Sequence, residues 1–500
     1  MHRWLGAALA GVVTLGAARA EAFCGFYVAP GESKLTNDAT MVVLLRDGTR
    51  TVLSMQNDYQ GPPEDFALVV PVPVVLQKDN VKTLERDIFA RVDTLAAPRL
   101  VEYWEQDPCP EWERDSDNKE GGTGTRAKGE EGSMGRQRYG VPAVWIEAKF
   151  AVGEYEIVIL GANDALALDG WLRDNHYRIP QGAEEALRPY VTAGSKFFVA
   201  KVDTKKVAFA NGRARLSPLR FHYDSETFSL PVRLGLLNSS GHQDLVVHVL
   251  ARQRYDVANY PRATLPTNLE VDDSVRARYG ELYAAVFDAT LEKHPKAVVT
   301  EYAWSYNNCD PCPMPPLTES ELKVLGADVA PSGAQSGEWV LTRLHARYSK
   351  ADLGADLVFV EAPPIHGGRE DGDHSTEARP SQGSNDFQTR FIVRHEWTGP
   401  ITCSDPMRGM WGGPPSNRPR LPPKTRDPEV TRGAIDLATI LRTRVDSIGV
   451  VGNAPRLSSY DPDDDTFGAQ RRRFGWGALG GLGLAVAIAT VTELRARRRR

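Results

Sequence analysis

The alternation of apolar and polar positions predicts strands over much of the chain from residue 41 to residue 254. MVVLLRDGTRTVLSM, from Met41, carries Asp47 and Gly48 between two apolar runs, which is a typical signal of a β-hairpin. FALVVPVPVV, from Phe66, is apolar as well. Its prolines cannot donate hydrogen bonds to a neighbouring strand, so this segment is expected to be an edge strand or an extended connector.

Apolar positions at three- and four-residue steps predict helices between these strands. In VKTLERDIFARVDTL one apolar face runs from Val81 to Leu95, and Asn80 is the expected cap. Further on, the strands YEIVIL, from Tyr155, and SKFFVAKV enclose two helical segments, the first of which Asn163 is expected to cap. A strand, two helices and a returning strand indicate a sheet with helices on one face.

The second half of the chain has the same mixture of elements. Ser274 is the expected cap of a long helix from Val275 to about Lys293, and Thr318 with Glu321 has the pattern of a capping box. The predicted fold class is therefore α+β, with mixed or antiparallel sheets and helices packed on one face. We expect two lobes and, after them, one C-terminal transmembrane helix.

Polar stretches divide the chain into the expected parts. A signal peptide is predicted over residues 1–22 and an N-terminal α+β domain over 23–258, which contains a flexible polar insertion at 117–138. After a polar join with two prolines, a second α+β lobe with a Pro/Gly-rich tail is expected over 272–458. A charged stalk, 459–473, follows it.

The N-terminus has the layout of a secretory signal. Arg3 is followed by a short apolar run, and small residues stand at two possible cleavage sites, ending at Ala20 and Ala22. The apolar run is too short to span a bilayer comfortably. The sequence therefore predicts export.

The C-terminus has the layout of a membrane anchor. The uncharged run from Phe474 to Thr492 is about 28 Å long as a helix, enough for the hydrocarbon core, and predicts a transmembrane helix at 474–493. Residues 494–500 form a basic tail that the positive-inside rule places in the cytoplasm. Its arginines are Arg495, Arg497, Arg498, Arg499 and Arg500.

Small residues recur every four positions along this predicted span. Gly477, Gly481, Ala485 and Ala489 would fall near one helix face, where two helices can approach closely. Self-association of the span is one interpretation, and the general abundance of small residues in membrane helices is the other. The Gly-rich span with its basic cluster also resembles bacterial C-terminal sorting signals that a protease removes.

Composition and motifs narrow the possible functions. A net charge of −5 gives no basic field, which argues against nucleic acid as a partner. The ten histidines form no HExxH motif, and the chain has no GxSxG motif and no glycine-rich phosphate loop. Accordingly, the sequence predicts no catalytic residue, cofactor or metal.

Five cysteines lie in the part predicted to be outside the cytosol, where disulfides persist. Since five is odd, at least one thiol is free or paired between chains. Proximity along the chain favours a Cys24–Cys109 bridge. The second expected bridge joins the pair Cys309 and Cys312 to Cys403.

The CDPC motif of Cys309 and Cys312 has three possible interpretations. A redox site needs its first thiolate at a helix N-terminus, but prolines follow the motif and the next helix is expected only near Thr318. A zinc site needs two further ligands at ordinary spacing, and no second CxxC or HxxxH exists. A structural disulfide is therefore favoured over redox and metal sites.

Several long stretches together resemble a known bacterial family. They are FCGFYVAPGESKL, SMQNDYQGPPEDFALVVPVP, GEYEIVILGANDALALDGWLRDNHYRIP, LGADLVFVEAPPIHGGRE and HEWTGPITCSDPMRGMWGGPP. The family is domain-of-unknown-function family 2330, and the resemblance covers most of residues 23–415. It implies secreted or envelope-attached proteins, often with a C-terminal membrane segment, and it transfers no catalytic residue.

These observations predict an exported, membrane-anchored envelope protein with its main domains outside the cytoplasm. Its expected role is that of a non-enzymatic module that binds or scaffolds another envelope protein. The alternatives are an extracytoplasmic thiol–disulfide oxidoreductase that uses the CDPC motif, and a hydrolase whose residues are assembled only by the fold.

Overall fold

The computed structural model describes most of the chain from residue 26 to residue 457. The described residues are 26–28, 36–37, 40–56, 59–60, 67–109, 143–175, 177, 182–210, 213–238, 242–334, 339–349, 351–352, 354–369, 375–416, 422–425 and 435–457. The predicted signal peptide with Ala20 and Ala22, the insertion at 117–138, the stalk and everything after it lie outside these residues, and so does Cys24. Within the described ranges, none of the helices combines the length and the apolar character that a membrane crossing needs.

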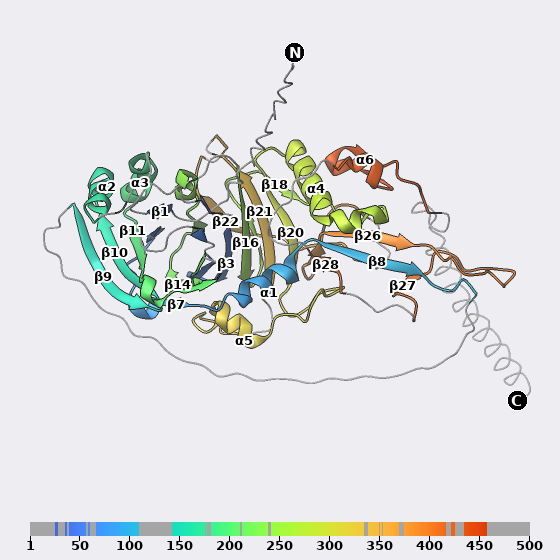
Figure 1. The fold of residues 1–500 in the computed structure, drawn as a ribbon, viewed down its shortest axis with the longest axis horizontal. Helices are drawn as coiled ribbons and strands as arrows, with labels where there is room; N and C mark the ends of the chain where they lie inside the picture. Colours follow the sequence, from blue (N-terminus) through green and yellow to red (C-terminus); the bar gives the residue numbers. More distant parts are fainter. Residues whose placement is uncertain are drawn as a thin grey trace, which may run out of the picture.

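An eleven-stranded mixed sheet forms the centre of the molecule (Figure 1). Most neighbouring strands are antiparallel, but β3 pairs with β16 in parallel. The strands in spatial order are β24 (Arg379–Pro380), β23 (Ile365–Gly367), β25 (Asp386–Gln388), β20 (Val298–Ser305), β21 (Val340–Tyr348), β16 (Gln243–Ala251), β3 (Thr40–Asp47), β4 (Arg50–Gln56), β14 (Leu219–Asp224) and β7 (Val81–Thr83), with β18 (Arg262–Thr264) beside β20.

A second, five-stranded antiparallel sheet packs against one face of the central sheet. Its strands in order are β1 (Phe26–Val28), β6 (Ala67–Val72), β11 (Lys196–Val202), β10 (Tyr155–Ala162) and β9 (Val144–Val152). Fully buried residues of the two sheets, such as Leu44 and Val247 from one and Ile157 and Phe198 from the other, share one apolar core. Burial of this shared face is the main favourable contribution to folding here.

Helices cover the outer faces of this sandwich. Helices α2 (Ala165–Asp174) and α3 (Ala183–Thr192) pack on the five-stranded sheet, where Leu168 and Leu187 are buried. Helix α1 (Asp87–Ala96) and the long helix α4 (Tyr279–Lys293) lie on the outer side of the central sheet. The expected mixed α+β architecture, with several sheets and few helices, is confirmed.

A third sheet extends away from the sandwich as an arm (Figure 1). Its strands are β19 (Leu269–Glu270), β26 (Arg390–His395), β8 (Arg99–Glu105) and β27 (Trp411–Gly412), with β28 (Lys424–Thr425) also on β8. The fully buried carboxylate of Glu105 accepts hydrogen bonds from the backbone of Trp397 and Gly409 and from the side chain of Arg408. This one carboxylate therefore holds the segment between β26 and β27 against β8.

The remaining elements are small. The strands are β15 (Ser229–Leu230), β22 (Leu357–Ala362) and β17 (Arg254–Val257) in one sheet, and the pairs β2 (Thr36–Asn37) with β5 (Tyr59–Gln60), β12 (Ala208–Ala210) with β13 (Arg213–Arg215), and β29 (Arg444–Val445) with β30 (Val450–Val451). The short helical pieces are α5 (Glu319–Leu322), α6 (Leu437–Ile440) and the turns η2 (Lys78–Asn80), η3 (Thr204–Lys206), η4 (Arg233–Asn238), η5 (Asp273–Arg278), η6 (Lys323–Ala327) and η7 (Asp446–Ile448).

Local sequence signals are confirmed where the turn or cap itself decides the structure. Strands β3 and β4 form the predicted hairpin, with Asp47 opposite Arg50 and Gly48 at a positive φ of 57°. The capping box of Thr318 and Glu321 opens α5 as expected. For α2, however, the cap is Asp164 rather than Asn163, since the Asp164 carboxylate accepts the Ala167 N–H.

Two longer predictions are wrong. Residues 81–83 form strand β7 rather than the first turn of a helix, because Val81 pairs with Phe221 at the edge of the central sheet; α1 begins only at Asp87. The segment from Phe66 is neither an edge strand nor a connector, because β6 lies between β1 and β11. Its Pro71 is tolerated because β1 pairs only with Ala67–Val69 and stops short of it.

Similarly, the long helix starts later than expected. The cap residue is Asp272, whose side chain accepts the Ser274 N–H, and the turn η5 precedes α4 at Tyr279.

The proposed division between 23–258 and 272–458 stays a prediction about domains. Strand β16 belongs to the first of these predicted domains and β21 to the second. In the central sheet the two strands are paired continuously from Gln243 to Ala251.

Candidate functional site

Two disulfides are present among the described residues. Cys109 is bonded to Cys403, with Cα atoms 5.7 Å apart, and Cys309 is bonded to Cys312, with Cα atoms 4.9 Å apart. The expected Cys24–Cys109 bridge and the expected link from the CDPC pair to Cys403 are therefore wrong. The arm explains the outcome, because parallel pairing of β8 with β26 brings the segments that follow the two strands to the same end.

The two bridges differ greatly in what they contribute to the fold. Cys109–Cys403 spans 294 positions of sequence, whereas Cys309–Cys312 spans three. In the chain-entropy account, closing these loops stabilises the native state by about 6 and about 2 kcal/mol, respectively. The long bridge is therefore mainly structural, while the CDPC bridge contributes about a third as much to stability.

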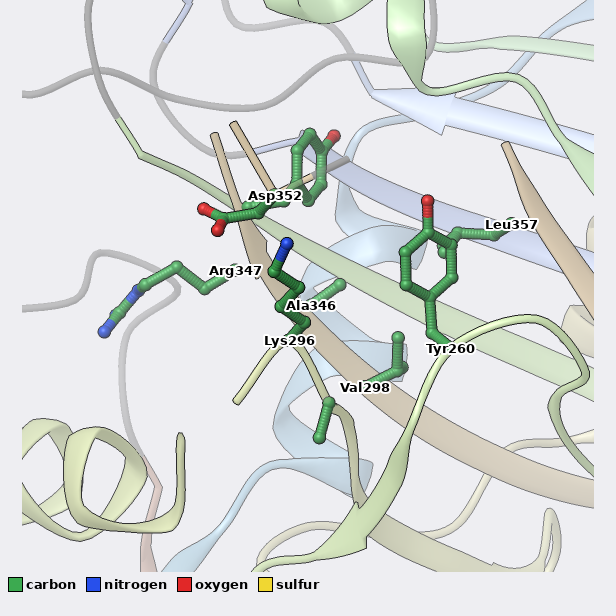
Figure 2. Close-up of a pocket in the computed structure, with 9 residues that line it drawn as sticks. Tyr260, Lys296, Val298, Ala346, Arg347, Asp352 and Leu357 are labelled. Atoms are coloured by element: carbon green, nitrogen blue, oxygen red, sulfur yellow. The ribbon is translucent and has the colours of Figure 1, made fainter. Parts of the chain in front are cut away.

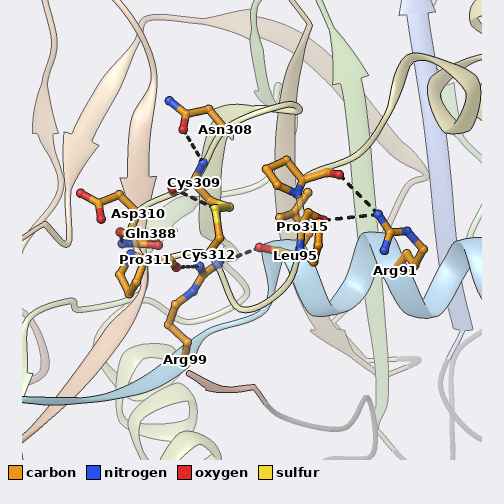
Figure 3. Close-up of a disulfide and its surroundings, with 11 residues drawn as sticks. Arg91, Leu95, Arg99, Asn308, Cys309, Asp310, Pro311, Cys312, Pro315 and Gln388 are labelled. Atoms are coloured by element: carbon orange, nitrogen blue, oxygen red, sulfur yellow. Dashed lines mark hydrogen bonds between the residues drawn. A yellow bond between two sulfur atoms is a disulfide. The ribbon is translucent and has the colours of Figure 1, made fainter. Parts of the chain in front are cut away.

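The CDPC loop is held by side chains from distant parts of the chain (Figure 3). Gln388 of β25 donates its amide N–H groups to the carbonyl oxygens of Asp310 and, at 2.7 Å, of Gly368. The Cys309 N–H is bonded to the side chain of its neighbour Asn308 at 2.9 Å. Cys309 is 7 % exposed, and Cys312 is half-buried.

Arg99 is the least expected neighbour of this loop. Its side chain is fully buried, and its guanidinium lies directly beside the disulfide loop (Figure 3). Nη1 donates to the carbonyl of Pro311 at 2.8 Å, and Nη2 donates to the carbonyl of Leu95, in the last turn of α1, at 2.7 Å. Burial lowers the pKa of Arg99 from its ordinary value, against smaller opposing effects of Tyr302 and Tyr279.

No carboxylate in the described part of the chain lies at ion-pair distance from Arg99, and the charge of Asp310 in the loop acts on it only from farther away. The Nε of Arg99 has no hydrogen-bond partner among the described residues. Leaving a buried cation with carbonyl partners only is costly. The negative end of the α1 dipole and the face of Tyr302, whose ring centre lies 5.6 Å from Arg99 Cζ, offset part of this cost.

The helix dipole of α5 does not reach the cysteines. Helix α5 begins at Glu319, after the Thr318 cap, as the sequence predicts. In the part of the chain that the structure describes, no group of three or more His, Cys, Asp or Glu side chains is placed to hold a metal ion. Two arginines lie near the CDPC loop: Arg369, which is 3.6 Å from the exposed carboxylate of Asp310, and the buried Arg99.

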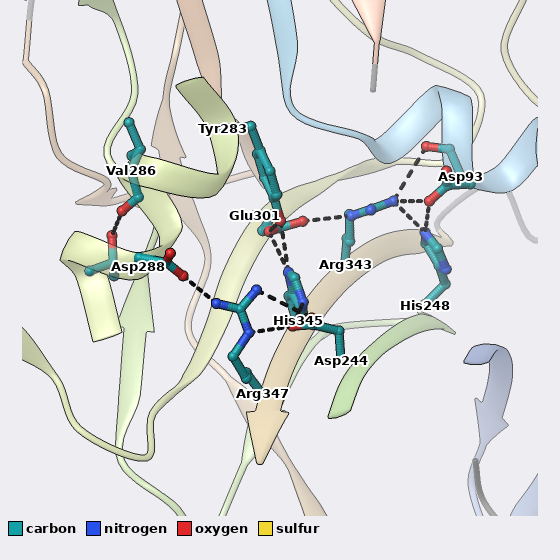
Figure 4. Close-up of polar contacts among 11 residues, drawn as sticks. Asp93, Asp244, His248, Tyr283, Val286, Asp288, Glu301, Arg343, His345 and Arg347 are labelled. Atoms are coloured by element: carbon teal, nitrogen blue, oxygen red, sulfur yellow. Dashed lines mark hydrogen bonds and ion pairs between the residues drawn. The ribbon is translucent and has the colours of Figure 1, made fainter. Parts of the chain in front are cut away.

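A second polar site lies under helices α1 and α4, on the outer face of the central sheet (Figure 4). Strand β21 alternates between Leu344 and Ala346, which face the sandwich core, and Arg343, His345 and Arg347, which face the helices. Because the helices cover that face, the side chains of these three basic residues are at most 6 % exposed. Each therefore requires a buried partner.

The centre of this site is a charged cluster around Arg343. Its Nε lies 2.7 Å from Glu301, and its Nη1 pairs with Asp93 of α1. Glu301 is the extra residue of a β-bulge in β20, since Thr300 pairs with Leu344 and Tyr302 with Arg343. The bulge is what turns this carboxylate toward Arg343.

Next along the strand, His345 lies between two carboxylates. Its Nε2 is 2.9 Å from Asp244, and its Nδ1 is 3.1 Å from Glu301 and 2.7 Å from the hydroxyl of Tyr283. Phe287 of α4 stacks on the imidazole at 4.0 Å between ring centres. These contacts fix the ring on every side and leave no open position beside it.

The buried charges of the cluster are compensated by one another. Burial on its own would raise the pKa of Glu301, but the charge of Arg343 and the hydrogen bond from His345 bring it to about 2. Burial, reinforced by Arg343, holds the pKa of His248 well below its ordinary value, so this neighbouring imidazole is neutral. Glu301 is thus charged, and ion pairs with Arg343 hold the cluster together.

The cluster reaches the surface at Arg347, next to a small hollow. Arg347 is bonded to Asp244 at 2.8 Å and pairs with the half-exposed Asp288. The hollow is lined by residues that include Tyr260, Lys296 and Asp352 (Figure 2). Figure 2 shows Arg347 extended away from Tyr260.

Sequence patterns reveal the CDPC pair, but they reveal neither its neighbour Arg99 nor the cluster around Arg343. Arg99 is separated from the CDPC motif by some two hundred residues, and Arg343 lies on a strand that could equally have been half-exposed. The one available signal is the run RLHAR in β21, in which three basic side chains share one face of a strand.

The chain matches one family model, described as an uncharacterized protein conserved in bacteria, of domain-of-unknown-function family 2330, over residues 18–360. The match includes the CDPC motif, Arg99 and the buried cluster. It ends before residues 395–415, which carry the last of the stretches that resemble the family. No curated protein and no solved structure matches the chain.

Proposed function

The chain belongs to domain-of-unknown-function family 2330, and from that premise we propose that it is an exported envelope protein whose body binds or scaffolds another envelope component. In this proposal, a leader at residues 1–22 is removed and a span at 474–493 retains the protein in the membrane. The basic tail, residues 494–500, then lies in the cytoplasm and the folded body outside it.

The Cys109–Cys403 bridge is the main support for this location. It staples the arm and closes a loop of almost three hundred residues. Cytosolic glutathione and thioredoxin keep such cysteines reduced, whereas extracytoplasmic compartments preserve the bond. A fold that depends on this bridge fits a protein that works outside the cytosol.

The body supports a binding role more than a catalytic one. The most elaborate constellation of charged side chains, around Arg343, is buried under α1 and α4 and is satisfied by its own partners. Among the residues that the structure describes, the exposed large apolar side chains are instead spread over several elements of the surface. They are Val74, Ile146, Leu166, Val324, Val360, Ile401 and Val451.

Fractionation of cells that produce the full chain tests the location. We expect the protein in the membrane fraction, without residues 1–22, and with Cys109 and Cys403 protected from a maleimide unless a reductant is added first. A matched variant, Ala20→Arg with Ala22→Arg, should keep its leader. Recovery of the wild-type chain as a dissolved cytosolic protein with its leader uncut and its thiols free would overturn the proposal.

Site-specific photo-cross-linking in intact cells tests the binding role. A photoreactive residue is placed at each of the seven exposed apolar positions in turn. One defined adduct at one position or at adjacent positions is expected, and the other positions serve as controls. If none of the positions yields an adduct, the described body is not a binding module of this kind.

A further inference from the structure

The CDPC bridge combines three properties that a structural disulfide does not need. It closes a loop of four residues, it includes the half-buried residue Cys312, and it lies beside a buried cation that makes no ion pair among the described residues. We propose that Cys309 and Cys312 form a thiol–disulfide exchange site that accepts electrons from a dithiol of another extracytoplasmic protein, with Arg99 stabilising the thiolate that is released.

The position of Arg99 carries the argument. Its Nη1 donates to Pro311, the residue directly before Cys312, so the guanidinium is attached to the loop itself. A thiolate formed in this loop would supply the counter-charge that Arg99 lacks among the described residues. Positive charge next to a cysteine lowers the pKa of its thiol, and it does so without a helix N-terminus at the motif.

Accessibility assigns different roles to the two sulfurs. Cys309 is 7 % exposed, whereas Cys312 is half-buried. Asp310, between them, has a side chain that is 59 % exposed, so the loop is at the surface. An incoming thiolate therefore attacks the sulfur of Cys312.

The exchange then balances as follows. The partner's thiolate forms a bond to Cys312 Sγ, the Cys309–Cys312 bond breaks, and Cys309 leaves as a thiolate beside Arg99. The partner's second thiolate attacks its own sulfur in the mixed disulfide and releases Cys312. Two electrons pass from the partner dithiol to the bridge, the partner becomes a disulfide, and its two protons end on the two cysteines or in solvent.

This inference goes beyond the proposed binding role. Its chemistry belongs to the folded body and can be measured on the purified full chain in detergent, whatever the location of the protein. Failure of fractionation and failure of the exchange measurement are thus separate results.

The first test is a redox titration with glutathione buffers of defined ratio, followed by acid trapping, alkylation and mass analysis. The Cys109–Cys403 bridge is the internal control. We expect the equilibrium constant for reduction of Cys309–Cys312 to be at least 100-fold larger than that of the control bridge. This ratio corresponds to a difference in reduction potential of about 60 mV for a two-electron couple. Reduction of the two bridges at the same ratio would overturn the proposal.

The second test addresses Arg99 as a positioning residue. Arg99→Gln removes the charge and keeps hydrogen-bond donors, and Arg99→Lys keeps the charge. We expect Arg99→Gln to shift the equilibrium at least 10-fold toward the disulfide, and Arg99→Lys to recover most of that shift. Equal titrations for the wild type and both variants would remove Arg99 from the proposal and overturn it.

The third test does not depend on the folding of Arg99 variants. Single cysteine variants are incubated with glutathione disulfide as the probe, and the retained Cys109–Cys403 bridge reports that each is folded. Cys309→Ser leaves the accessible Cys312 and should form a mixed disulfide at least 10-fold faster than Cys312→Ser does. Equal slow rates in both folded variants would contradict the exchange site.

Discussion

The carboxylate of Glu301 and the guanidinium of Arg343 lie 2.7 Å apart, with side chains that are 0 % and 2 % exposed. A bulge in β20 produces this contact by turning Glu301 toward the neighbouring strand. Both charges have been removed from water, so each depends on the other and on Asp93 and His345 for compensation.

The first prediction concerns this pair. Glu301→Gln leaves Arg343 and His345 with one carboxylate fewer in a dry environment, and the free energy of unfolding should fall by about 3 to 5 kcal/mol. Denaturant unfolding followed by fluorescence measures it. The matched control is Glu184→Gln, which breaks a helical ion pair with the exposed Arg188 and should leave stability almost unchanged.

A second prediction is the loss of stability in acid. The pKa of Glu301 is about 2 in the folded protein and 4.5 ordinarily, so the charged carboxylate stabilises the native state above about pH 4.5. That contribution, about 3 kcal/mol, should disappear as the pH falls from 4.5 through 2. Unfolding curves at stepwise pH test this. In Glu301→Gln the same interval should show a flatter dependence, and an unchanged slope would contradict the assignment.

The two disulfides should differ in their effect on stability. Replacing Cys109 and Cys403 together by alanine removes the covalent link that holds the arm and should lower the free energy of unfolding by about 4 to 6 kcal/mol. Replacing Cys309 and Cys312 together should cost less than half as much, because the closed loop is so short. Thermal unfolding of both double variants compares them, and equal losses would show that the short bridge supports the fold.

Substitution of two glycines by alanine should change the stability of the protein in opposite directions. At Gly368 the φ of +77° is strained for other residues, and an added Cβ would lie 2.0 Å from the carbonyl oxygen of Gln388. Gly368→Ala should therefore cost about 2 to 4 kcal/mol and disturb the Gln388 side chain that holds the CDPC loop. Gly170→Ala, in α2 with open space around it, should instead stabilise by about 0.5 to 1 kcal/mol. Melting temperatures that move in the same direction would contradict this reading.

Elements whose cause is local could be predicted from sequence. The hairpin of β3 and β4 depends on Asp47 and Gly48, and the start of α5 depends on Thr318 and Glu321, so the residues that decide these structures are neighbours. The helix predicted from Val81 was wrong because the apolar spacing of this segment fits a helix, while its actual strand partner, Phe221, is far away in sequence. Pattern alone does not weigh a local helix against a distant strand edge.

The candidate site was only half predictable for the same reason. The CDPC pair and the absence of a helix at the motif could be inferred from neighbouring residues. The pairing of Cys109 with Cys403 and the approach of Arg99 to Pro311 could not, because both follow from the parallel pairing of β8 with β26 and from the position of α1. Such contacts are properties of the assembled sheets.

Strand β8 lies between β26 and β27, strands that the ribosome makes about three hundred residues later. Its edges therefore remain without these partners until nearly the whole body has been synthesised, and nascent chains that end before Trp411 should be readily degraded by proteases. For the exported protein that we propose, this late completion would keep the chain threadable through a translocation channel, because the topology postpones the compact state until the last strands arrive.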